Sequence, residues 1–108
     1  MVATLTSNPS QPVLRGSYDR QVDVLHLGLG DPVEVEGDGL PNGVELDFSL
    51  EENRPCGVTI IGFSRNGWNA NVRGLAAIVA DHLGLDTAYV LRRIEDIAGD
   101  QSPPTVIR

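Results

Sequence analysis

Apolar and polar residues alternate through the first half of the chain. Between residues 13 and 63, short apolar runs with a period of two are separated by glycine, proline, asparagine and aspartate, which is the pattern of strands joined by turns. It predicts strands over 13–18, 22–29, 33–36, 44–49 and 57–63. Short strands with such tight connections indicate an antiparallel β-meander of four or five strands.

Between residues 69 and 98 the apolar residues recur with the period of an α-helix. One helical face holds Val72, Leu75, Ala76, Val79 and Leu83, and a second, further along, holds Val90, Leu91, Ile94, Ile97 and Ala98. Gly84 is placed to end the first helix, and Asp86 to cap the second. We therefore expect an α+β fold in which one or two C-terminal helices pack on one face of the meander.

The chain of 108 residues suits one domain. We expect residues 13–98 to form it, with a β-meander over 13–63 and a helical part over 69–98. Residues 1–12 and 99–108 are polar and interrupted by proline, and they are predicted to be terminal tails.

The formal net charge of −7 narrows the range of partners. No lysine is present, and all eight basic residues are arginine. Phosphates repel a chain of this charge, so the sequence argues against general nucleic-acid binding and favours a basic protein partner. No apolar run approaches the ~20 residues of a membrane span, and no signal peptide is evident, so the sequence predicts a cytoplasmic protein.

Few residues are available for metal or cofactor chemistry. Cys56 is the only cysteine, and His26 and His82 are the only histidines. This inventory excludes an intrachain disulfide, a cysteine-cluster zinc site and a histidine-rich metal site. A phosphate-binding loop with its lysine is also excluded, and Gly28-Leu29-Gly30 lacks the third glycine of a dinucleotide fingerprint. We expect neither a metal nor a cofactor.

Several short motifs resemble a known family. They are Tyr18-Asp19, Asp23, Leu25-His26-Leu27-x-Leu29, Gly43-Val44-Glu45-Leu46-Asp47 and Gly57-Val58-Thr59-Ile60-Ile61. Residues 18–63 are in this respect similar to the bacterial domain of unknown function 2283. The resemblance implies a bacterial source and a β-meander followed by a helix, and it implies no reaction.

The chain departs from this family pattern at three places within the motifs and in its length. His26 stands where tyrosine is common, and Thr59 where an acidic residue is common. A simpler Asp-Gly turn is replaced by residues 53–56, and the helical extension from Asn69 is longer than the family leads us to expect.

The strongest candidate for function is an acidic segment. Residues 31–52 contain eight acidic residues and no basic one. They could bind a basic partner or simply be solvated charges that protect strand edges from aggregation. The predicted partner-binding residues are Glu34, Glu36, Glu45, Asp47 and His26.

Two other functions remain open on the sequence. The spacing over residues 76–97 is that of a helix-turn-helix, which would present Arg92 and Arg93 to DNA, although Glu95 and Asp96 lie on the same helix.

Alternatively, Asp19, Asp23 and His26 would form a small-ligand or cation site, or the acid–base pair of a small enzyme. Against that reading, Asp19 and Asp23 are also the residue type that stabilises a turn and the entry to a strand.

These patterns together favour a small acidic domain that acts without catalysis by binding another protein. An exposed strand edge and an incompletely covered sheet would also favour a homodimer.

Overall fold

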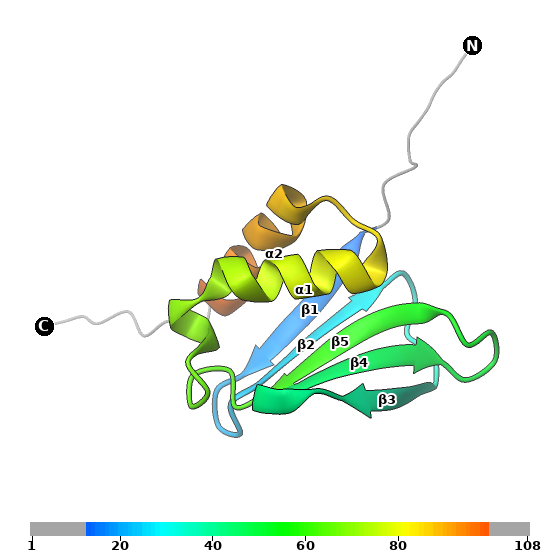
Figure 1. Cartoon of the computed structure of the whole chain (residues 1–108), viewed down its shortest axis with the longest axis horizontal. Helices are drawn as coiled ribbons and strands as arrows, with labels where there is room; N and C mark the ends of the chain where they lie inside the picture. Colours follow the sequence, from blue (N-terminus) through cyan, green and yellow to red (C-terminus); the bar gives the residue numbers. More distant parts are fainter. Residues whose placement is uncertain (1–12, 100–108) are drawn as a thin grey trace, which may run out of the picture.

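The computed structural model describes residues 13–99 and consists of two layers, a five-stranded sheet and a pair of helices that lie on one of its faces (Figure 1). The strands are β1 (Leu14–Asp19), β2 (Val24–Leu29), β3 (Val35–Gly39), β4 (Val44–Ser49) and β5 (Pro55–Ile61). The helices are α1 (Val72–Leu83) and α2 (Thr87–Gly99), with 3₁₀ turns η2 (Pro41–Gly43) and η3 (Trp68–Ala70). The predicted α+β fold is confirmed, whereas the predicted tails, apart from Gly99 in α2, lie outside the described residues.

All strand pairs are antiparallel, and the strand order is β1-β2-β5-β4-β3. The meander connectivity therefore holds separately for β1-β2 and for β3-β4-β5. The β2–β3 connection carries the chain to the far edge of the sheet, and β5 returns to pair with β2. This order gives the centre to β5, whose Val58 and Ile60 are fully buried, and leaves the exposed residues of β3 at an edge.

Strands β2, β3 and β5 begin or end at other residues than predicted, and in β2 and β5 the reason is a positive φ. β2 begins at Val24 instead of residue 22 because Asp23 has a φ of 60° and belongs to the turn. β5 ends at Ile61 because Gly62 has a φ of 76°. β3 spans 35–39 instead of 33–36, so Gly37 and Gly39, which were predicted to lie in a loop, are strand residues.

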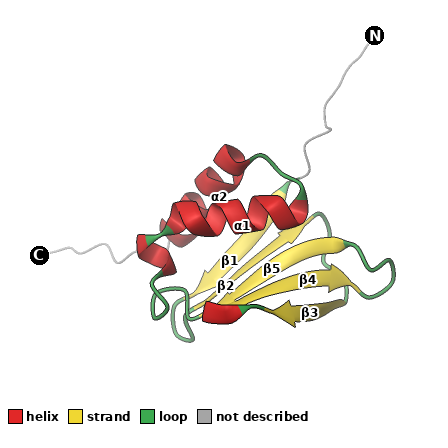
Figure 2. Ribbon diagram, viewed as in Figure 1, coloured by secondary structure: helices red, strands yellow, loops and turns green. Residues whose placement is uncertain are grey.

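The hydrophobic core lies between the sheet and the helices, and Figure 2 shows the two helices lying over one face of the sheet. The leucine face of β2, with Leu25 and Leu27, packs there as its alternation predicted. The helices contribute the buried residues Leu75, Ala76, Val79, Ala80, Leu83, Val90, Ile94 and Ile97. Within residues 13–99, the helices cover only this face of the sheet.

The helix α2 also caps the outer edge of β1. The Leu14 amide donates to the Tyr89 hydroxyl at 3.0 Å, and the Arg93 Nε donates to the Leu14 carbonyl oxygen at 2.9 Å. At Gly16 a Cβ would lie 2.7 Å from the Ile97 side chain, so glycine is what allows α2 to approach the strand so closely. The helix α2 therefore occupies the Leu14 end of this edge.

Candidate functional site

The face of the sheet opposite the helices, called here the open face, carries two cross-strand rows of side chains. The strand register gives one row as Ser17, His26, Thr59 and Glu45. The second row is Arg15, Gly28, Gly57, Asp47 and Gly37. Because residues directly opposite each other share a face, the register alone places these residues together.

A shallow hollow of about 260 Å³ lies over the second row. Gly28 and Gly57 are paired with each other and form a floor without side chains. Pro32 and Val33 of the β2–β3 connection also line the hollow, together with Asp47 of β4. The hollow therefore combines apolar walls with a carboxylate.

Asp47 is the buried acidic residue of the open face. It is 5% exposed, and its Oδ2 accepts a hydrogen bond from the Thr59 hydroxyl at 2.8 Å. Its Oδ1 is buried and has no hydrogen-bond partner among residues 13–99. A buried carboxylate oxygen without a donor is energetically costly, so this atom calls for a donor from elsewhere.

Glu45 lies beside Asp47 on the same strand face. Its carboxylate folds over Gly37, where it occupies the space that a Cβ would take, and Gly37 is the residue paired with Asp47. A side-chain hydrogen bond between the two carboxyl groups, then burial, and then the negative charge of Asp47 raise the pKa of Glu45. The two acids therefore form one negatively charged unit at the β3 side of the open face.

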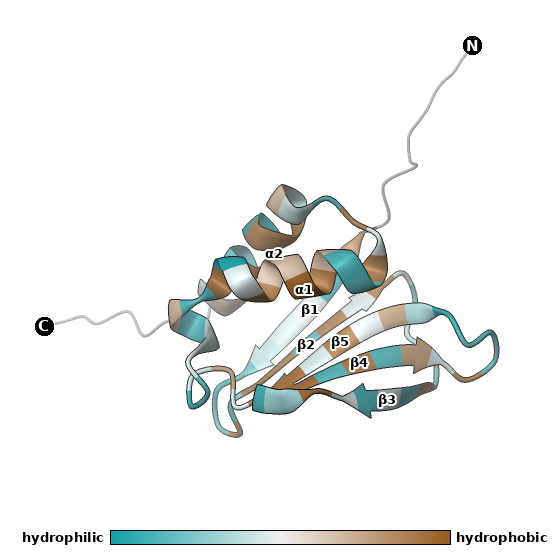
Figure 3. Cartoon of the chain, viewed as in Figure 1, coloured by the Kyte–Doolittle hydropathy of each residue, from teal (hydrophilic) through white to brown (hydrophobic). Residues whose placement is uncertain are grey.

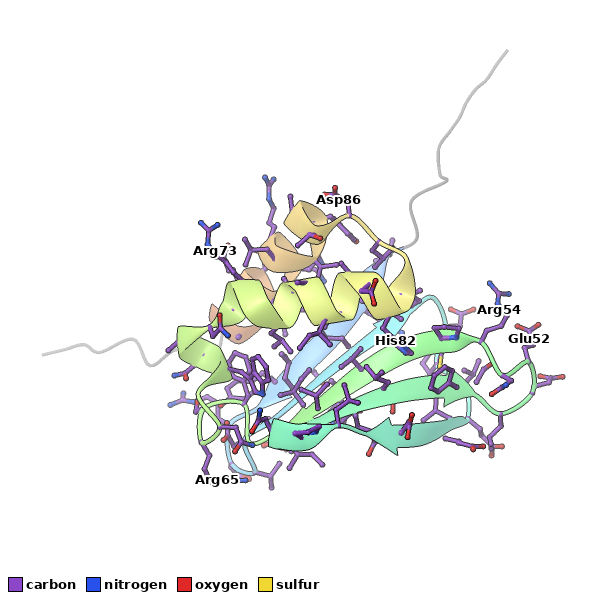
Figure 4. The ribbon with its side chains drawn as sticks, in the orientation of Figure 1. Glu52, Arg54, Arg65, Arg73, His82 and Asp86 are labelled. Atoms are coloured by element: carbon purple, nitrogen blue, oxygen red, sulfur yellow. The ribbon has the colours of Figure 1, made fainter. Side chains whose placement is uncertain are left out.

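The helix layer supports this unit from behind through His82. Figure 4 shows His82 between α1 and the sheet, and its Nε2 lies 3.1 Å from the Asp47 carbonyl oxygen. A carbonyl can only accept, so Nε2 carries the proton. The His82 ring also packs edge-on against Phe48 at 5.0 Å between ring centroids. This role of His82 was not predicted, because it depends on a contact between residues 35 positions apart in the chain.

A register shift accompanies this contact. It falls between Asp47 and Phe48 and leaves Cys56 without a cross-strand partner. Burial raises the pKa of the Cys56 thiol, the Asp47 charge adds to the rise, and Arg15 opposes it. The thiol is therefore not activated as a nucleophile.

The five predicted partner-binding residues fall in three places. Glu45, Asp47 and His26 share the open face, with Thr59 between His26 and Glu45. Glu36 is opposite Phe48 and so belongs to the other face, at the edge of the sheet. Glu34 lies in the β2–β3 connection and borders a second hollow of about 730 Å³ near the turn that carries Glu52 and Arg54 (Figure 4).

The edge formed by β3 is accessible. All five of its residues are exposed, β3 is hydrophilic along most of its length (Figure 3), and no further strand follows it in the described part of the chain. The Leu40 amide donates to the Val44 carbonyl oxygen, and the Leu50 amide donates to the Glu34 carbonyl oxygen. These two bonds show which parity of residue in the β3–β4 ladder bonds across it, namely the even-numbered residues. Since that parity alternates, the amides and carbonyls of Val35, Gly37 and Gly39 point away from β4.

Asp23 and Asp19 have structural partners. The Asp23 carboxylate accepts hydrogen bonds from the Tyr18 hydroxyl at 2.6 Å and from the amides of Ser64 and Arg65. Asp19 accepts from the Gln21 amide at 3.0 Å within the turn. His26 lies on the open face of the sheet, whereas both aspartates belong to the turn region at its end. The hydrogen bonds of the two aspartates therefore serve the turn and not a ligand or acid–base site shared with His26.

The two arginines of the helix-turn-helix hypothesis differ in environment. Arg92 is exposed, whereas Arg93 donates to Leu14 and lies 3.8 Å from Asp96. Arg93 thus holds α2 against β1 and is not presented for DNA.

We expect Arg93→Ala to lower the free energy of unfolding by about 1–2 kcal/mol, because the Leu14 carbonyl loses a charged donor. Arg92→Ala should cost less than about 0.5 kcal/mol, as is usual for exposed positions. Urea denaturation of both variants measures the difference, and equal stabilities would contradict the assigned role.

Metal ligands, membrane-spanning helices and similar proteins give the remaining evidence on this site. Within residues 13–99, no three His, Cys, Asp or Glu side chains come together as metal ligands. None of the described helices has the length and apolar character needed to cross a membrane. The chain matches no family model, no curated protein and no solved structure at a significant level, so the resemblance of residues 18–63 to the domain of unknown function 2283 stays a prediction.

Proposed function

We propose that this domain is a protein-interaction module that binds a partner by adding a strand of that partner to β3. The asymmetry between the two sheet edges carries the proposal. α2 caps the β1 edge through Tyr89 and Arg93, whereas Val35, Gly37 and Gly39 present their backbone groups outward. Strand addition to such an edge is a general mode of peptide recognition, in which main-chain hydrogen bonds supply affinity.

Charge favours a basic partner. Glu34, Glu36 and Asp38 lie along the β3 edge, and the whole chain carries a net charge of −7. Pairing of β3 with β3 of a second copy would bring these like charges opposite each other, which is destabilising. A basic strand would instead be attracted and steered to this edge, so we favour it over the homodimer that an exposed edge also allows.

Affinity capture from the native cell lysate tests this proposal when it compares matched variants. Glu36→Lys with Asp38→Lys reverses two charges at the edge, and Val35→Pro removes one outward amide at a first strand position, where proline is tolerated. We expect both variants to lose the partner that the unaltered protein retains. Hydrogen exchange of the complex should then show protection of the Val35, Gly37 and Gly39 amides.

Asp81→Lys with Glu95→Lys is the control. These exposed helix residues undergo the same change in charge on the opposite layer of the molecule, so partner binding should persist. Equal loss in both double variants would indicate a general charge effect. Retention by Val35→Pro, or protection confined to other strands, would overturn strand addition at β3.

A further inference from the structure

We infer that Glu45 and Asp47 form a receptor for one guanidinium or ammonium group, supplied by a basic side chain of the partner strand that reaches across Gly37. The inference rests on the proposed strand addition and names the side chain that the added strand must contribute. A small cation presents the same chemistry, which allows the receptor to be tested without the partner.

One carboxylate oxygen of Asp47 is buried without a hydrogen-bond donor in the described part of the chain. The residue is 5% exposed, one carboxylate oxygen is bound by Thr59, and the other has no donor among the described residues. A guanidinium or ammonium group has several N–H donors and a positive charge, so it supplies both the hydrogen bond and the charge that this atom lacks.

Within residues 13–99, no hydrogen bond from a neighbouring side chain reaches the second Asp47 oxygen. The Arg15 Nε donates to the Gly30 carbonyl oxygen, and its guanidinium lies over Gly28, two strands from Asp47. The Thr59 hydroxyl has one proton, which goes to Oδ2. His82 binds the Asp47 main chain from the other face. The Glu45 carboxyl can donate to Asp47 only when it is protonated, so the ionised pair leaves a place for an external cationic donor.

Gly37 provides the path from the β3 edge to the receptor. Gly37 lies between the free edge and Asp47 and has no side chain, and the Glu45 carboxylate already occupies the space above it. An added strand would lie about 4.8 Å from β3. A lysine or arginine opposite Gly37 can extend its apolar stem over the glycine when the flexible Glu45 side chain rotates aside, and it then places its charged end between the two carboxylates. A neutral donor could supply the hydrogen bond but not the positive charge.

Titration with n-butylguanidinium tests the receptor directly. We expect shifts of the Gly37, Asp47 and Thr59 amide signals in nuclear magnetic resonance spectra, with saturable binding. The neutral isostere n-butylurea should bind about tenfold more weakly or not at all, because it lacks the charge. Bound guanidinium should also lower the pKa of Glu45, because its positive charge stabilises the ionised form of the carboxyl group.

Two isosteric variants locate the cation. Asp47→Asn and Glu45→Gln should each weaken n-butylguanidinium binding by about tenfold, and Glu51→Gln in the β4–β5 turn should not change it. Asparagine can still accept from Thr59, which preserves the fold around position 47.

The outcomes separate the two proposals. Equal binding of n-butylguanidinium and n-butylurea, or binding unaffected by Asp47→Asn, overturns the receptor while partner capture at β3 can still stand. Binding at the receptor together with failed capture at β3 supports the cation site and removes the strand-addition function. Partner capture that survives Val35→Pro but is lost in Asp47→Asn would leave the receptor supported without an added strand.

Discussion

Replacing Gly43 by alanine is expected to lower the free energy of unfolding by about 3–5 kcal/mol, a large share of the stability of a domain of this size. Gly43 has a φ of 81°, a conformation that costs L-residues about 1–2 kcal/mol. A Cβ there would also overlap the Ile61 carbonyl oxygen and lie 2.8 Å from the Asn66 Nδ2. Because one of these atoms is backbone, a side-chain rotation cannot relieve the overlap.

Gly67→Ala separates the two contributions. Gly67 has a φ of 83°, close to that of Gly43, but a Cβ at this position meets no atom within 4 Å. It should therefore cost only the backbone penalty of about 1–2 kcal/mol. Urea denaturation with fitted m-values compares the two variants. If they are equally stable, the close approach of the η2 turn to the end of β5 is not what requires glycine at position 43.

Asp23→Asn is expected to destabilise the domain by about 2–4 kcal/mol at neutral pH. Asparagine tolerates the positive φ at this position, so the change removes the charge and an acceptor without altering the backbone preference. The carboxylate joins the β1–β2 turn to the loop before α1 through Tyr18, Ser64 and Arg65, and the Asp23 carbonyl oxygen adds bonds from the amides of Gly62 and Phe63.

The same carboxylate makes part of the stability depend on pH. Burial acts to raise the pKa of Asp23, but the hydrogen bonds from Tyr18, Ser64 and Arg65 and the charge of Arg65 together lower it below its usual value. Its contribution is therefore complete above the unfolded-state pKa of about 4 and is lost as the pH falls through the lower folded-state value. The stability difference between the unaltered protein and Asp23→Asn should shrink in that acidic range.

Asp19→Asn is the matched control for Asp23. Asp19 belongs to the same turn region but is exposed and accepts one hydrogen bond, from Gln21. It should cost about 1 kcal/mol or less. Thermal denaturation from pH 2 to 7 measures both effects, and a stability difference for Asp23→Asn that does not change with pH would contradict the assigned charge interaction.

The candidate site was only partly predictable from sequence. Glu45 and Asp47 follow each other at alternate positions of a predicted strand, so their common face could be read from the pattern. Glu36 was grouped with them because it is near in sequence and acidic, yet the register places it on the opposite face. Nothing local distinguishes these cases, because each depends on how the β3–β4 ladder is aligned.

Local sequence by itself determined the elements of this protein. The alternation of the strands, the helical stripes and the break at Gly84 follow from short-range sterics and from burial of one face, and they correctly gave an α+β fold. Strand order, the capping of β1 by α2 and the unsatisfied oxygen of Asp47 depend instead on contacts between residues far apart in the chain. Only the tertiary structure decides such contacts, because their free energy depends on which surfaces meet and not on the residues next to them in sequence.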